Sequence, residues 1–133
     1  MVEREKTSLN RQILILVSDL FLSVKIGALL KQLGYSFQVI VSEPDALRIL
    51  QTTIPRMIIL DLNFLHDGLK IIQRVRKEKA TKDIPIFAFS RHTEKKVMKK
   101  AKSLGCTEVF SRPEFLKKLP SLVKSASGGQ KEG

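Results

Sequence analysis

Residues 57–60 constrain the fold of this chain more than any other stretch, because they form an apolar run, Met-Ile-Ile-Leu, that ends on Asp61. The run has no polar alternation, so both of its faces should be buried, as in a central strand of a parallel sheet. Pro55 lies just before the run and marks its start. Such a strand delivers its last side chain to the carboxyl edge of the sheet, where open α/β folds bind ligands. Asp61 is therefore a candidate site residue, and a carboxylate that simply ends a strand in water is the alternative.

Other apolar runs with strand character occur along the chain, and each is followed by a helical pattern. Strict alternation of strands and helices predicts a parallel sheet with helices on both faces and right-handed crossovers. The predicted fold class is therefore α/β, in a single domain, and Pro120 is expected to disturb or split the last helix. The predicted strands are residues 12–17, 37–41, 57–62, 84–89 and 108–110, and the predicted helices are residues 20–33, 43–53, 68–79, 94–104 and 114–124.

The length of 133 residues fits one domain. We assign this domain to residues 12–124, with a loose polar lead-in at 1–11 and a disordered tail at 125–133. No apolar run is long enough to cross a bilayer, and no signal-peptide pattern follows the first residues. The single cysteine, Cys106, allows no internal disulfide. These features predict a cytoplasmic protein without a membrane partner.

The charge of the chain is strongly positive, since 24 Lys and Arg oppose 13 Asp and Glu for a net charge of +11. Such a balance favours anionic partners, namely acidic protein surfaces, nucleic acid or phosphate groups. The lysines of helix 94–104 are most simply a solvated helix face. The cations of helix 68–79, Arg76 among them, are likewise expected to face water.

Polar side chains follow four of the predicted strands at the point where each strand ends. Ser18 and Asp19 follow the first strand, Asp61 lies at the end of the third, Ser90 follows the fourth and Arg112 follows the fifth. The carboxyl ends of parallel strands lie on one edge of the sheet, so neighbouring strands would bring these side chains into one pocket. The alternative is that strand ends face water, which favours polar residues there for no further reason.

The residue types in this predicted pocket suit phosphoryl chemistry. Two close carboxylates repel unless a cation lies between them, and oxygen ligands with several waters suit Mg²⁺. Asp19, Asp61 and the backbone carbonyl of Asn63 are the candidate ligands. The Asp61 carboxylate could attack a phosphoryl group, since catalysis there is mostly positioning and charge neutralisation. Ser90 and Arg112 could hold the oxygens of the transferred group.

This pattern resembles the receiver domain of two-component response regulators over residues 11–124. The resemblance implies a flavodoxin-like (βα)5 fold, a doubly wound five-stranded parallel sheet with strand order 2-1-3-4-5. It also implies a signalling domain rather than an enzyme, with at most self-catalysed phosphoryl transfer and dephosphorylation. Its partner would be a histidine kinase or a phosphotransfer protein, in a phosphorelay that uses Mg²⁺.

Individual residues carry the resemblance. Asp61 matches the phosphoacceptor, Asp19 matches the second acid of the pair that binds Mg²⁺, and Ser90 matches the hydroxyl that contacts the phosphoryl group. Arg112, followed by Pro113, matches the family's Lys-Pro dipeptide.

The chain also departs from the family, so it is expected to be an atypical member. Ser18 stands where the first acid of the pair belongs, which removes one charge from the metal site. Arg112 replaces a lysine, and its planar guanidinium is not equivalent to a compact ammonium. Val109 occupies the position of the aromatic switch residue, and the loop after Asp61 lacks the usual proline.

These departures leave alternative functions open. The first alternative is a degenerate receiver that acts as a protein-interaction module without phosphorylation, with Arg112 paired to Asp61. Helices 94–104 and 114–124, which form an output surface in the family, would then offer a basic face to an acidic protein. The second is a basic nucleic-acid-binding domain. Against it, the phenylalanines lie in core patterns rather than on an exposed stacking surface, and no helix-turn-helix or zinc motif is present.

Overall fold

The computed structural model describes residues 11–64, 68–90 and 94–131. Its five strands are all parallel and lie in the order β2-β1-β3-β4-β5, which confirms the predicted fold class and strand order. The strands are β1 (Ile13–Leu16), β2 (Phe37–Ile40), β3 (Met57–Asp61), β4 (Ile86–Ser90) and β5 (Glu108–Ser111). The helices are α1 (Leu20–Gln32), α2 (Glu43–Thr52), α3 (Gly68–Lys77), α4 (Lys95–Leu104) and α5 (Arg112–Lys131).

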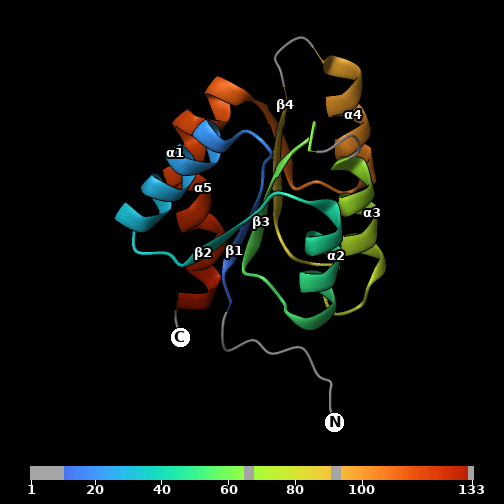
Figure 1. The fold of residues 1–133 in the computed structure, drawn as a ribbon, viewed down its shortest axis with the longest axis horizontal. Coiled ribbons are helices and arrows are strands. Elements are labelled where there is room, and N and C mark those ends of the chain that lie inside the picture. The colour runs from blue at the N-terminus through green and yellow to red at the C-terminus, as the bar shows by residue number, and fades with distance from the viewer. Residues whose placement is uncertain (1–10, 65–67, 91–93, 132–133) are drawn as a thin grey trace.

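The sheet lies between two layers of helices, with α1 and α5 on one face and α2, α3 and α4 on the other (Figure 1). Successive residues of a strand point to opposite faces, so each central strand supplies two cores. In β3, Met57 and Ile59 pack with α1 and α5, whereas Ile58 and Leu60 pack beneath α2, α3 and α4. All four are 0% exposed, which explains why this run shows no polar alternation. No described helix has the length and hydropathy needed to cross a bilayer.

Two of the helices that leave the carboxyl edge, α1 and α2, begin with side-chain caps. The Asp19 side chain accepts a hydrogen bond from the backbone N–H of Leu22 and caps α1, and Ser42 caps α2 in the same way. Beyond the C-terminal ends of α1 and α4, Gly34 and Gly105 have φ values of 88° and 119°, which glycine adopts without strain. The caps make the turns tight, and the turn after β1 places Asp19 at the rim of the sheet.

Helix α5 differs from its prediction in two respects. It continues through Pro120 without a break, and it extends to Lys131. Residues 125–131 of the predicted disordered tail 125–133 are therefore helical, and residues 132–133 lie outside the described residues. A proline inside a helix costs about 3 kcal/mol. Beyond it, Val123 is fully buried and Ala126 packs against the same core, and apolar burial of this kind is worth ~1.5–3 kcal/mol per large side chain. The gain from continuing the helix offsets the cost of the proline.

Arg76 is a second correction, because its half-buried guanidinium is turned back onto the fold and hydrogen-bonded there. Its Nε donates to the carbonyl of Gly105 at 2.9 Å, and its NH1 donates to the carbonyls of Lys82 and Ile84, both at 2.8 Å. Burial lowers the pKa of Arg76 below the usual arginine value. Arg76 thus ties α3 to the end of α4 and to the loop that enters β4.

Candidate functional site

Of the acidic groups that the structure describes at the carboxyl edge of the sheet, the Asp61 carboxylate is the most buried, with a side chain that is 3% exposed. Its position is set by the turn after β3, in which the backbone N–H of Asn63 donates to Asp61 Oδ1 at 2.9 Å. The start of α3 packs closely on this turn, since a Cβ at Gly68 would lie 3.0 Å from the Asp61 carbonyl oxygen. One carboxylate oxygen is therefore engaged by the backbone, while Oδ2 points to a cation.

That cation is Arg112, the first residue of α5, and it lies between two carboxylates. Its NH1 is 3.5 Å from Asp19 Oδ2, and its NH2 is 3.9 Å from Asp61 Oδ2. Both distances exceed those of ordinary hydrogen bonds, so the attraction is mainly Coulombic. The guanidinium also lies 5.9 Å above the ring of Phe89. The structure thus brings Asp19, Asp61 and Arg112 together, as the sequence predicted, with a positive charge shared by the two acids.

Ser90 is at the same edge, but its hydroxyl is engaged elsewhere. Its position one residue beyond Phe89, which is in register with Asp61, places it next to the β3 strand end. The side chain is buried, and Ser90 Oγ donates to Glu94 Oε1 at 2.6 Å. Glu94 is the residue that precedes α4, and its side chain makes no capping hydrogen bond to that helix.

Glu94 is a site residue that sequence reasoning missed. It lies four residues after Ser90 and just before a lysine-rich helix, where an acid is ordinarily read as favourable to the helix N-terminus. Only the fold shows that its carboxylate turns back to Ser90.

The donor set fits a hard divalent cation better than a transition metal. Within the described part of the chain, no three His, Cys, Asp or Glu side chains gather into a metal cluster. The remaining ligands of a metal ion held by Asp19 and Asp61 would therefore be backbone oxygens, such as the Asn63 carbonyl, and water. Few protein oxygens with several waters is the coordination that Mg²⁺ prefers. The guanidinium between the same two oxygens shows that the acids are placed to share a cation.

The buried cysteine lies away from this edge and has no part in the site. Cys106 is 5% exposed, and burial raises the pKa of its thiol to about 12. A thiol with that pKa stays protonated near neutral pH, so it is neither a nucleophile nor a metal ligand there.

Comparison with known proteins matches this chain to one family and one fold. The family model for the response regulator receiver domain matches residues 14–124, whereas no curated protein matches the chain. The signal receiver domain of a signal transduction histidine kinase from Syntrophus aciditrophicus is 21% identical, with a TM-score of 0.81 over 92% of this chain and 94% of that one.

Two further solved structures are similar. The receiver domain of a sensor histidine kinase from Pseudomonas aeruginosa PAO1, which has a magnesium ion coordinated in its active site cleft, is 18% identical. Its TM-score is 0.79 over 90% of this chain and 98% of that one. The signal receiver domain of a DNA-binding response regulator from Colwellia psychrerythraea 34H is 25% identical, with a TM-score of 0.72 over 86% of this chain and 98% of that one.

Proposed function

Because this chain belongs to the response regulator receiver domain family, we propose that Asp61 accepts a phosphoryl group in a cytoplasmic two-component phosphorelay. The donor is the phosphohistidine of a histidine kinase or of a phosphotransfer protein. The observation that supports this assignment best is the Asp61 carboxylate itself. It is almost buried at the end of the central strand, and it faces Asp19 across a shared positive charge.

In the proposed transfer, a carboxylate oxygen of Asp61 forms a bond to phosphorus as the bond between phosphorus and the donor histidine nitrogen breaks. The departing imidazole takes up a proton, and the product is an acyl phosphate on Asp61. Asp61 Oδ1 is already oriented by the Asn63 N–H, which leaves Oδ2, the oxygen nearer Arg112, as the nucleophile. This orientation lowers the entropic cost of reaching a reactive geometry.

Asp19, Asp61 and the Asn63 carbonyl would hold Mg²⁺, which when bound neutralises negative charge on the carboxylates and on the phosphoryl oxygens. Ser18 is neutral and exposed, so the site has one acid fewer than the family pattern. We expect metal affinity to be correspondingly weak, since attraction to the cation scales with the charge of its ligands.

Arg112 supports a second function, a receiver that signals without phosphorylation. Its guanidinium attracts the two carboxylates that a metal would need. While Arg112 remains there, its positive charge supplies part of the charge that Mg²⁺ would bring to the two carboxylates. The structure is therefore compatible with an Arg112-closed resting state that either opens to accept a phosphoryl group or acts as the signalling form.

The hydrogen bond between Glu94 and Ser90 leads to a prediction about phosphoryl uptake. The carboxylate engages the hydroxyl proposed to contact the phosphoryl group, and it adds a negative charge near the site. Glu94→Gln retains the size of the side chain but removes that charge, and we expect it to raise the rate of uptake by about threefold to tenfold, or ~0.6–1.4 kcal/mol. The measurement is the time course of uptake by intact mass, with the surface substitution Glu114→Gln as the matched control. Slower uptake in Glu94→Gln would mean that Glu94 orients Ser90 productively.

The proposed function is tested by incubating the protein with acetyl phosphate and Mg²⁺ and measuring its intact mass. We expect one added phosphoryl group, which is lost when Asp61 is replaced by asparagine. Omitting Mg²⁺ should slow the uptake. A protein that stays unmodified at every metal concentration would instead support the phosphorylation-independent function.

A further inference from the structure

Helices α3 and α4 carry an unusual concentration of positive charge on one side of the molecule. Their twenty residues contain four basic side chains in α3 and five in α4, and neither helix contains an aspartate or a glutamate. The two helices contact each other on the face of the sheet opposite α1 and α5, so their charges form one surface. We define this basic face by its outward cations, which are Lys70, Arg74, Lys77, Lys95, Lys96, Lys99, Lys100 and Lys102.

The cations of the basic face have no acidic partner among the residues that the structure describes. Lys102 donates to the carbonyl of Thr107 at 2.8 Å, which leaves its charge unneutralised. Two acids lie nearby and keep their charge, but neither forms an ion pair with these cations: Glu94 accepts from Ser90, and Glu108 borders a groove with Lys99 and Lys102. Arg76 belongs to α3 but not to the basic face, because its guanidinium donates hydrogen bonds to backbone carbonyls within the fold. The charge of the face is therefore available to a partner.

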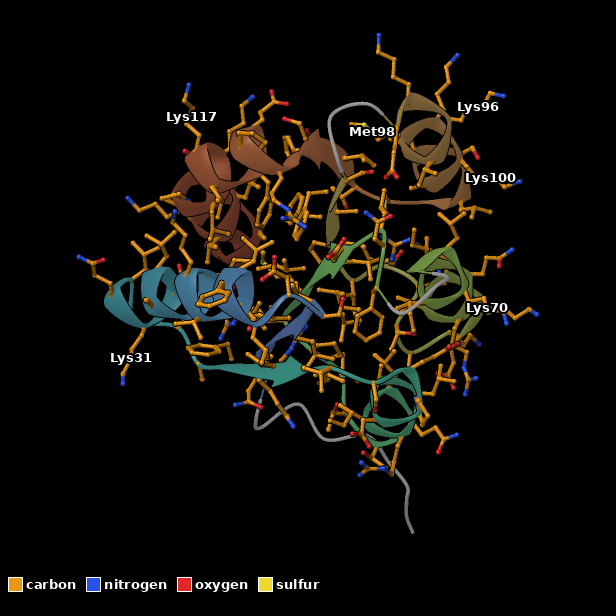
Figure 2. All side chains as sticks on the ribbon, turned by 45° about the horizontal axis from the view of Figure 1, so that its top comes forward. Lys31, Lys70, Lys96, Met98, Lys100 and Lys117 are labelled. Carbon is orange, nitrogen blue, oxygen red and sulfur yellow. The ribbon has the colours of Figure 1, made fainter. Side chains whose placement is uncertain are left out.

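The basic face also contains a groove, with a volume of about 580 Å³, between α2, α3 and α4. Lys70, Arg74 and Lys77 line it with a single acid, Glu43. Figure 2 shows Lys70, Lys96 and Lys100 on the same side of the molecule, away from Lys31 and Lys117 on the other. A ligand that follows this face would meet cations from both helices and from the groove.

The composition of the basic face favours nucleic acid over an acidic protein. Protein interfaces are depleted in lysine and depend on buried apolar or aromatic anchors. Among the described residues, the large exposed apolar side chains lie elsewhere, in α1 and in or just after β2, and they are Leu20, Phe21, Val24, Val39 and Val41. Lysines on flexible stems act as point charges suited to phosphate groups. A domain with a pI of about 10.1 and its cations clustered along two helices has the electrostatic character of a nucleic-acid-binding surface.

We propose that the basic face binds the phosphate backbone of duplex nucleic acid without reading its sequence. The helices contain no aromatic residue on which an unpaired base could stack, so a single strand gains nothing over a duplex from stacking. The side chains of the face are lysine and arginine. Where no protein element enters a groove of the duplex, such side chains contact phosphates and do not specify bases. This activity is separate from phosphoryl uptake at Asp61, which lies at the edge of the sheet.

The test is fluorescence anisotropy with two unrelated labelled duplexes of about 20 base pairs, titrated with the full chain from about 50 to about 200 mM salt. We expect a Kd of about 1–100 µM near physiological salt, equal for the two duplexes, and a linear fall of log K with log salt. Polyglutamate, added as a competitor at the same concentration of charge, should displace the duplex poorly. Efficient displacement would favour an acidic protein as the partner and overturn the proposal.

Two triple variants with the same net charge locate the surface. Lys96→Gln, Lys99→Gln and Lys100→Gln remove charge from the basic face, whereas Lys25→Gln, Lys31→Gln and Lys117→Gln remove it from exposed positions on α1 and α5. The first variant should bind about tenfold or more weakly at low salt, with a salt slope smaller by up to about 2.7, and the second should bind almost as the unmodified chain does. Equal losses in both variants, or no binding of duplex at low salt, would refute the proposal. Equal circular dichroism and Tm values confirm that both variants are folded.

Discussion

Arg112→Lys should raise the rate of phosphoryl uptake at Asp61. In the unmodified protein, the two terminal nitrogens of the guanidinium lie 3.5 Å from Asp19 Oδ2 and 3.9 Å from Asp61 Oδ2. Lysine has a single ammonium nitrogen, which cannot occupy both positions at once and so cannot attract both carboxylates in this way. Partly exposed ion pairs are worth ~0.2–1 kcal/mol each, so releasing both should raise the affinity for Mg²⁺ by about 2-fold to 30-fold. We expect uptake at limiting Mg²⁺ to increase by a similar factor.

The control for this substitution is Arg48→Lys, an arginine-to-lysine change in an ion pair on the exposed surface of α2. It should leave uptake unchanged. Adding Ser18→Asp to Arg112→Lys should increase uptake further, because it restores an acid beside Asp19 and strengthens attraction to the cation. A loss of uptake in Arg112→Lys would show that arginine at this position assists the phosphoryl group instead of competing with the metal.

Arg76→Ala should destabilise the fold by about 3 kcal/mol and lower Tm by roughly 10 °C. The substitution removes three hydrogen bonds from one charged group to the carbonyls of Gly105, Lys82 and Ile84. Hydrogen bonds from charged groups are worth ~1.5–3 kcal/mol each. Because Arg76 is only half-buried, water partly replaces the lost donors, and we reduce the estimate to about 1 kcal/mol for each bond.

Denaturant unfolding with Lys70→Ala as the control measures this effect. Lys70 is an exposed cation in the same helix, and its removal should change the free energy of unfolding by less than ~0.5 kcal/mol. If both substitutions had equally small effects, the Arg76 hydrogen bonds would contribute little to the link between α3, α4 and β4.

The sequence was sufficient for the fold because the apolar runs are long enough to define buried strands and the helices alternate with them. The end of α5 was harder to place, since a polar, small-residue segment resembles a tail unless the packing of Ala126 is known. Three site residues, Asp19, Asp61 and Arg112, were predictable because parallel strands deliver their ends to one edge.

Contacts that depend on side-chain direction were not predictable. Arg76 has the pattern of an exposed cation, and its carbonyl partners are 6–29 residues away in the chain. Glu94 is close to Ser90 in sequence, but nothing in the sequence distinguishes an acid that turns back toward β4 from one that caps α4. In both cases the partner is set by packing between elements rather than by local spacing.

The most direct test of the central assignment is intact-mass measurement of the unmodified chain and of Asp61→Asn after incubation with acetyl phosphate and Mg²⁺. We predict one phosphoryl group on the unmodified chain, located at Asp61 by peptide mapping, and none on the variant. Equal labelling of the two proteins, or a phosphoryl group mapped to another residue, would contradict the assignment of Asp61 as the phosphoacceptor.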